Sequence, residues 1–211
     1  MAKINVIDNL ASSLGRRDED PNIELAQKIA AAKDAAAVKD LIALLNDKKK
    51  DIHNDAIKVL YEVGYISPYL VKDHLGAFLS KLNSKNNRMI WGAMTAIDAI
   101  SQVAPDKIYA HLPEILDAGE KGSVITKDHV MGTLCNLAAN GKMADKVMPL
   151  LFEQLMQAAG NQFPMYAEKA MPVVTNKYKQ QFIAILNDRI EGLEKDSQKK
   201  RIEKLLKKLN K

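Results

Sequence analysis

Apolar residues recur along the chain in two kinds of stripe that take turns. The first kind is seen at Val38, Leu41, Ile42 and Leu45, which stand at positions i, i+3, i+4 and i+7. This spacing places all four side chains on one face of an α-helix. Further copies begin at successive intervals of 37, 37, 36 and 34 residues, in the segments 75–82, 112–116, 148–155 and 182–186. A fainter copy precedes the first, at Ile7, Leu10, Ala11 and Leu14.

The second kind of stripe lies between successive copies of the first. It is clearest in one set of apolar residues spaced i, i+4, i+7, i+8 and i+11, namely Ile52, Ala56, Val59, Leu60 and Val63. Adding 37 to each number gives five more apolar residues, Met89, Ala93, Ala96, Ile97 and Ile100. Later copies fall in the segments 130–141, 163–174 and 202–209. This spacing again places the apolar residues on one helical face, so a second series of amphipathic helices is predicted.

Polar turns separate the two stripes of each pair, at 46–49, 83–86 and 119–123. Each pair therefore predicts a helical hairpin. A single hairpin cannot bury both of its apolar faces, so the hairpins must stack against one another. The predicted organisation is all-α, with one domain over 1–211 made of six hairpins, at about 3–32, 36–64, 68–103, 105–140, 144–174 and 176–210.

One stretch resembles the HEAT and armadillo-like superfamily. It runs Leu-Ile-Ala-Leu-Leu-Asn-Asp over 41–47, followed by Asp51 and Ile52, with Ala56 further along. The family usually has Arg where this chain has His53, so the match to the signature is partial. The resemblance implies a right-handed α–α superhelix that acts as a non-enzymatic scaffold for a protein or peptide partner.

The resemblance also implies that the second helix of each hairpin lines the concave side. On the helix predicted over 89–100, residues opposite the apolar stripe would then face a partner. Applying this rule to all hairpins predicts a partner-binding surface formed by Trp91, Tyr61, Met94, Asp98, Asn54, Ile57, Met165, Lys200 and Lys207. Trp and Tyr are common anchors of interfaces. The alternative is that Trp91 fills the seam between two hairpins.

The net charge of +5 is confined to one end of the chain. Residues 189–211 contain nine Lys or Arg and four Asp or Glu, a balance of +5, which leaves the rest neutral. The terminal helix is basic and amphipathic, and we expect it to cap the stack rather than to anchor the protein in a membrane.

No run of about 18 apolar residues that would predict a transmembrane helix is found. The first residues do not have the features of a signal peptide. A single cysteine, Cys135, excludes an internal disulfide and suits a reducing compartment. We therefore expect a cytoplasmic protein.

The sequence predicts no catalytic, cofactor or metal site. Its four histidines, His53, His74, His111 and His129, lie in separate segments without a second ligand at i+3 or i+4. One alternative function remains, a nucleic-acid-binding protein related to the HEAT-like DNA alkylation-repair glycosylases. It would use Trp91 and Asp98 beside basic residues such as Arg88 and Lys58. The neutral balance of charge before residue 189 argues against this alternative, because binding several phosphates requires a row of cations.

Overall fold

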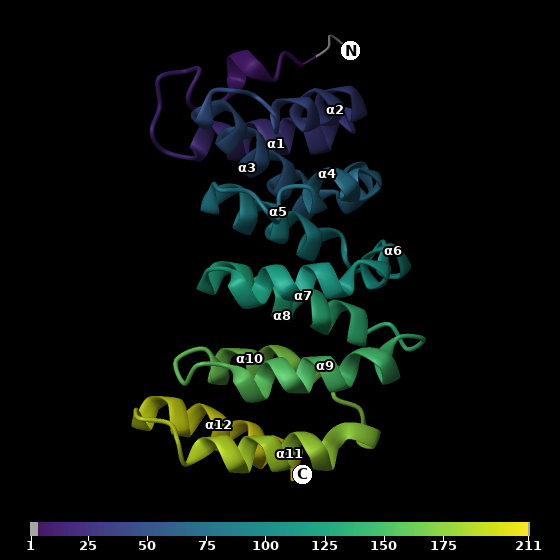
Figure 1. The fold of residues 1–211 in the computed structure, drawn as a ribbon, viewed down its shortest axis with the longest axis vertical. Coiled ribbons are helices and arrows are strands. Elements are labelled where there is room, and N and C mark those ends of the chain that lie inside the picture. The colour runs from purple at the N-terminus through teal and green to yellow at the C-terminus, as the bar shows by residue number, and fades with distance from the viewer. Residues whose placement is uncertain (1–3, 211) are drawn as a thin grey trace. The chain divides into compact units, whose positions relative to one another are not determined.

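The structure is a computed structural model that describes residues 4–210 (Figure 1). Over this range the chain forms twelve α-helices and four short 3-10 helices, with no β-strand. The all-α class that the two stripes predict is therefore confirmed. Contacts divide the chain into two compact units, Met1–Val130 and Met131–Lys211, and the division falls within one helix. That all six hairpins form one domain stays a prediction.

The described part of the first unit contains seven α-helices and part of an eighth. They are α1 (Asp20–Ala32), α2 (Ala35–Leu44), α3 (Lys50–Ile66), α4 (Leu75–Leu79), α5 (Asn87–Ile100), α6 (Pro105–Ala110), α7 (Leu112–Lys121) and the first half of α8 (Val124–Ala138). Short 3-10 helices stand at η1 (Ile7–Asn9), η2 (Pro68–Leu70) and η3 (Lys72–His74). Proline begins both η2 and α6, where a missing N–H costs nothing.

The second unit contains the rest of α8 and two further pairs of elements. They are α9 (Ala144–Gln157) with α10 (Phe163–Ala170) and η4 (Met171–Val173), then α11 (Asn176–Ile190) with α12 (Asp196–Leu209). Helices α11 and α12 lie side by side (Figure 1). Phe152 of α9 stacks on Phe182 of α11 with ring centroids 6.0 Å apart, which joins the two pairs.

The apolar stripe of α12 is buried, through Ile202, Leu205 and Leu209. Lys200, Lys204, Lys207 and Lys208 are left exposed on the remaining surface. Such a helix presents a polar outer side to solvent, as a terminal repeat needs for solubility.

The core of the first unit is built around α3, which packs against α1, α2 and α5. Of its predicted stripe, Ala56, Val59, Leu60 and Val63 are fully buried, and Ile52 is half-buried. The contact between α3 and α5 is unusually close at Gly92, where an added Cβ would lie 2.8 Å from Cγ1 of Ile57. Glycine at this position therefore lets the side chain of Ile57 lie against the backbone of α5.

The N-terminal segment differs from the prediction. Of the fainter stripe copy, Leu10 and Ala11 are buried, but Ile7 and Leu14 are 46% and 54% exposed. Only the three-residue η1 forms there. The prediction of a helix over this copy was wrong, because the segment is held by side-chain hydrogen bonds instead of by a repeated helical face. The predicted hairpin also began at Lys3, which lies outside the described residues.

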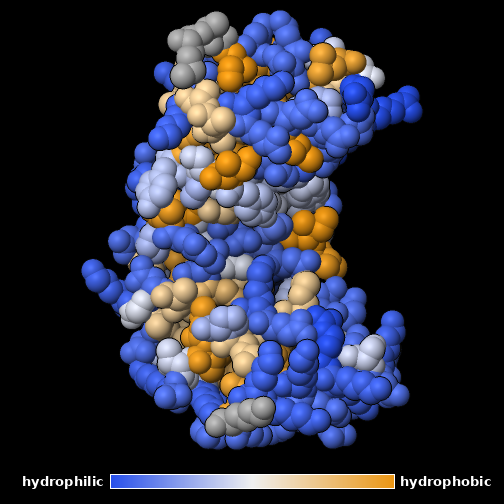
Figure 2. Space-filling view, turned by 180° about the vertical axis from the view of Figure 1, so that it is seen from behind, coloured by the Kyte–Doolittle hydropathy of each residue, from blue (hydrophilic) through white to orange (hydrophobic). Residues whose placement is uncertain are grey.

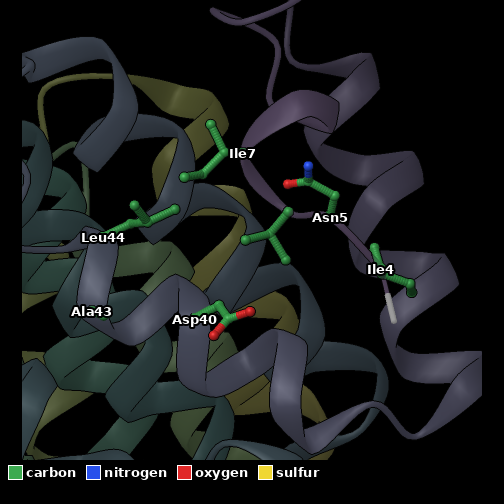
Figure 3. A pocket seen from close by; sticks show the side chains of 7 residues that line it. Ile4, Asn5, Ile7, Asp40, Ala43 and Leu44 are labelled. Carbon is green, nitrogen blue, oxygen red and sulfur yellow. The ribbon is translucent and has the colours of Figure 1, made fainter. Parts of the chain in front are cut away.

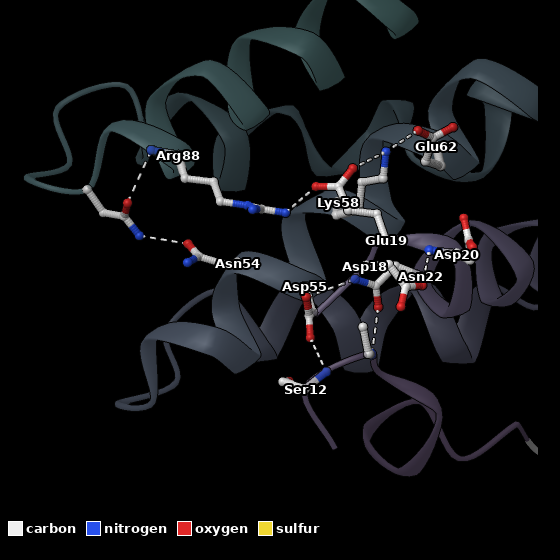
Figure 4. A network of polar contacts seen from close by, with 12 residues as sticks. Ser12, Asp18, Glu19, Asp20, Asn22, Asn54, Asp55, Lys58, Glu62 and Arg88 are labelled. Atoms are coloured by element: carbon white, nitrogen blue, oxygen red, sulfur yellow. Dashed lines mark hydrogen bonds and ion pairs between the residues drawn. The ribbon is translucent and has the colours of Figure 1, made fainter. Parts of the chain in front are cut away.

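Two buried polar side chains make these bonds. Asp55 of α3 accepts from the side-chain amide of Asn22 and from the backbone N–H of Ser12, both at 2.8 Å (Figure 4). Asn22 in turn accepts from the backbone N–H of Ala11 at 3.0 Å. The contacts fix the N-terminal segment and α1 onto α3.

On the face of the molecule seen in Figure 2, hydrophobic residues appear as separate patches among hydrophilic ones. A hollow of about 470 Å³ lies between the N-terminal segment and α2 (Figure 3), lined by Ile4, Asn5, Val6, Ile7, Asp40, Ala43 and Leu44. Its lining is largely aliphatic, and Asp40 supplies its carboxylate.

We expect Asp55→Ala to lower the free energy of unfolding by about 2–4 kcal/mol, because it leaves buried donors of Asn22 and Ser12 unpaired. Urea unfolding followed by circular dichroism measures this change. Asp51→Ala, at an exposed position one turn earlier on α3, is the control and should shift stability by less than about 0.5 kcal/mol. Equal effects from the two variants would contradict the role given to Asp55.

Gly92→Ala should destabilise the first unit by about 1–3 kcal/mol, because the new methyl group overlaps Ile57. Gly76→Ala on α4 is the matched control, since nothing lies within 4 Å of its added Cβ. The better helix propensity of alanine should leave that variant unchanged or more stable by up to about 1 kcal/mol. Thermal unfolding of both variants separates overlap from propensity, and a stable Gly92→Ala protein would rule out the close contact.

Candidate functional site

A surface of the first unit gathers the aromatic and charged side chains that α3 and α5 turn away from their apolar stripes. We call it the α3–α5 face, defined by Asn54, Lys58, Tyr61, Glu62 and Tyr65 of α3 and by Arg88, Trp91 and Asp98 of α5. On α3 these residues recur at i, i+4, i+7, i+8 and i+11, which is one side of a helix. Lys58, Tyr61 and Asp98 are buried, and the other residues of the face are half-buried or exposed.

Three aromatic rings form the centre of this face. The ring centroids of Tyr61 and Trp91 are 6.0 Å apart, and those of Tyr61 and Tyr65 are 6.3 Å apart in an edge-to-face arrangement. Such spacings are typical of stabilising aromatic pairs. Tyr61 is buried, Trp91 is half-buried and Tyr65 is 52% exposed. The cluster therefore runs from the interior of the unit to its surface.

Two cations of the face are paired within the chain. Nζ of Lys58 lies 2.9 Å from Oε2 of Glu19 and 2.7 Å from Oε1 of Glu62. Burial acts to lower the pKa of the Lys58 ammonium, but its hydrogen bonds, that to Glu62 foremost, outweigh this and raise the pKa. Arg88 of α5 donates to the other oxygen of Glu19, 2.5 Å away (Figure 4). One carboxylate thus joins the end of the N-terminal segment to both α3 and α5.

Each of these cations also lies over an aromatic ring. Lys58 Nζ is 4.9 Å from the centroid of the Tyr61 ring, and the guanidinium carbon of Arg88 is 5.8 Å from that of Trp91. Both distances are within the range of cation–π attraction. The rings of Tyr61 and Trp91 consequently already have a positive group beside them.

Tyr65 lies in a more negative environment. Burial, followed by the nearby carboxylates of Asp98 and Glu62, raises the pKa of the Tyr65 hydroxyl to about 12. Asp98 is itself held by Nδ1 of His129 at 2.9 Å. The half-exposed ring of Tyr65 beside two carboxylates is suited to a positively charged group.

Asn54 has a structural contact at the edge of the face. Its side-chain oxygen accepts from Nδ2 of Asn86 at 2.7 Å, and Oδ1 of Asn86 accepts from the backbone N–H of Arg88 at the start of α5. The amide of Asn86 therefore caps α5 while it is anchored to α3.

The structure corrects the placement of four predicted site residues. Ile57 and Met94 are fully buried, and Tyr61 and Asp98 are 6% and 8% exposed, although the sequence placed all four toward a partner. Close packing of α3 on α5 covers Ile57, which lies against Gly92. Trp91 is half-buried, between the two alternatives of an exposed anchor and a seam filler. The predicted binding roles of Trp91, Tyr61, Asp98 and Asn54 stay predictions, now on one defined face.

In the second unit, Met165 of α10 is 38% exposed, and Lys200 and Lys207 of α12 are exposed. Their binding roles also stay predictions.

Another basic residue of α12, Arg201, contacts α10. Arg201 donates two hydrogen bonds, of 2.9 and 2.7 Å, to the carboxylate of Glu168 on α10. These bonds, with weaker help from Lys204 and Lys208, hold the pKa of Glu168 below its usual value.

Sequence reasoning also missed Glu19, Glu62 and Tyr65. A signal existed for the last two, since Lys58, Glu62 and Tyr65 continue the polar side of α3. No local signal exists for Glu19, because its partner Arg88 is 69 residues away in the sequence.

Over the described part of the chain, no group of three or more His, Cys, Asp or Glu is arranged to hold a metal ion. Within the same range, none of the helices has the length and apolar character needed to cross a membrane.

Comparison with solved structures defines the class of fold. A designed armadillo repeat protein in complex with the peptide (KR)4 is similar with a TM-score of 0.70 at 15% identity, over 97% of this chain and 99% of that one. A second designed armadillo repeat protein gives 0.67 at 16% identity, over 97% of this chain and 100% of the other. An engineered protein gives 0.64 at 16% identity, over 98% and 99% of the two chains.

The chain therefore has the armadillo-type helical-repeat fold, as its resemblance implied. At these identities the likeness concerns the fold alone. No family model matches the sequence, and no curated protein matches it.

The hydroxyl of Tyr65 should ionise near pH 12 instead of near 10. Since the folded-state pKa is raised, the neutral hydroxyl stabilises the fold below pH 10, and this stabilisation is lost as the pH rises toward 12. The difference in tyrosinate absorbance between wild type and Tyr65→Phe, titrated against pH, measures this pKa. Asp98→Asn should move the transition to lower pH, and a Tyr65 transition near pH 10 in wild type would contradict the described environment.

Proposed function

We propose that the protein is a non-enzymatic repeat scaffold that binds a peptide or helix of another protein on the α3–α5 face. The observation that carries this proposal is the cluster of Tyr61, Tyr65 and Trp91, contributed by two neighbouring helices and reaching the surface at Tyr65. Trp and Tyr supply large contact areas at little cost in conformational entropy, and they dominate the energetics of many interfaces.

The charge of the face favours a ligand with a Lys or Arg side chain. Together with Glu19, the face carries three carboxylates against the two cations Lys58 and Arg88. Two of these carboxylates, Glu62 and Asp98, lie near the exposed ring of Tyr65, where Glu62 also pairs with Lys58 and Asp98 with His129. A basic side chain can place its charge between these carboxylates and its methylene groups along the ring. The (KR)4 peptide bound by a structurally similar designed protein is an example of a ligand of this chemistry.

The nucleic-acid alternative finds less support. It relied on Lys58 and Arg88, but Lys58 is buried between Glu19 and Glu62, and Arg88 by itself does not form the row of cations that several phosphates need. Carboxylates of Glu62 and Asp98 beside the aromatic cluster would repel phosphates. We also propose a cytoplasmic location, since the buried Cys135 cannot form an internal disulfide and suits a reducing environment.

The test is selection of twelve-residue peptides from a random displayed library on the immobilised full chain, with (KR)4 as a direct probe. Dissociation constants of the synthesised peptides are then measured by calorimetry. We expect Trp91→Ala and Tyr65→Ala to weaken binding by about tenfold or more, as loss of an aromatic anchor usually does. Trp91→Phe should retain most of the affinity.

Tyr69→Ala is the control for general effects of surface aromatics, because Tyr69 is 67% exposed and lies outside the cluster. Its affinity should stay within about twofold of wild type. A selection that yields no binder, or binders unaffected by Trp91→Ala, would overturn the proposal. Selected peptides that depend on Trp91 but contain no Lys or Arg would remove only the preference for a basic ligand.

A further inference from the structure

The side chain of Arg88 lies over the ring of Trp91, a residue of the proposed binding surface. Its guanidinium carbon is 5.8 Å from the ring centroid, and the side chain is only 35% exposed. A ligand that stacks on this side of the indole would meet the guanidinium first. Access to Trp91 therefore depends on what holds Arg88.

Glu19 holds the guanidinium of Arg88, although the two residues are 69 positions apart in the sequence. The residues before it, 13–18, are exposed, and Glu19 immediately precedes α1. Its carboxylate reaches Arg88 with one oxygen and Lys58 with the other (Figure 4). Lys58 also pairs with Glu62, whereas Arg88 forms its ion pair with Glu19.

The position of Arg88 over Trp91 costs free energy for two reasons. Arg88 stands in the first turn of α5, where the helix dipole disfavours a positive charge. Its Nε is buried without a hydrogen-bond partner, and an unpaired buried donor is unfavourable. The ion pair that offsets these costs is 35% exposed at Arg88 and 40% exposed at Glu19, and such pairs are weak in water. Covered and uncovered positions should therefore be close in free energy.

We infer that Glu19 and Arg88 form a removable cover over Trp91, and that ligand binding displaces the guanidinium from the indole. This inference rests on the proposed function and describes how the same site is regulated. Removing the carboxylate of Glu19 should release Arg88, expose Trp91 and favour the binding-competent state.

The chain contains a single tryptophan, so its fluorescence reports this position alone. We expect Glu19→Gln to increase the quenching of Trp91 by acrylamide about twofold, because an exposed ion pair is what keeps the ring covered. Asp18→Asn is the matched control, since it removes the same charge one residue away, where Asp18 pairs with Arg16. Quenching in that variant should equal wild type.

Salt provides an independent readout that needs no ligand. Raising sodium chloride from about 0.05 to 1 M should increase quenching in wild type, because salt screens the pair, and should have little effect in Glu19→Gln. Arg88→Gln should give the same increase as Glu19→Gln, which keeps the test available if either variant folds poorly by circular dichroism. Unchanged quenching in the folded variants would overturn the cover.

Ligand affinity tests whether the cover regulates binding. For peptides selected on wild type, Glu19→Gln should bind about threefold to tenfold more tightly, since the cost of uncovering is removed. Loss of a carboxylate would by charge alone weaken the binding of a basic peptide, so the expected sign is opposite to a simple electrostatic effect. Equal or weaker binding would overturn the cover, whereas failure of Trp91→Ala to weaken binding would overturn the site itself.

Discussion

Close packing of α3 against α5 is the constraint on which the rest of the first unit depends. Gly92 lets the side chain of Ile57 lie directly on the backbone of α5, so both helices bury one full side. Interiors are packed too densely for either helix to rotate without opening a void. The opposite sides are thereby fixed as well, which brings Tyr61 of α3 and Trp91 of α5 to within 6.0 Å. The candidate surface is a consequence of the core beneath it.

Buried polar groups also fix the N-terminal segment of the first unit. Asp55 and Asn22 fix the chain around Ser12 onto α3, and this positions the segment that ends at Glu19. Buried polar groups of this kind are directional, so they specify one arrangement where apolar contacts alone would tolerate several. The Glu19 carboxylate then reaches Lys58 and Arg88. The charge network of the surface thus depends on a polar contact inside the protein.

The sequence predicted the helices better than the contacts between them. The two alternating stripes were sufficient for the helices and their buried sides, because periodicity is a local property of the chain. They were insufficient for Ile57 and Met94, which stand near the border of the stripe and are covered by a neighbouring helix. The pair of Glu19 with Arg88 had no local signal, since it exists only after three helices have packed.

The net charge of the chain does not describe the charge of the α3–α5 face. The chain carries +5 overall, yet this excess stands in 189–211, and the aromatic cluster lies beside Glu62 and Asp98. Fields of exposed charges fade within about 10 Å at ordinary ionic strength, so the preference of this face is set by the charged groups close to Tyr65 and Trp91. A ligand on the proposed surface would therefore meet carboxylates that pair with Lys58 and His129 near the ring of Tyr65, and a guanidinium that pairs with Glu19 near the ring of Trp91.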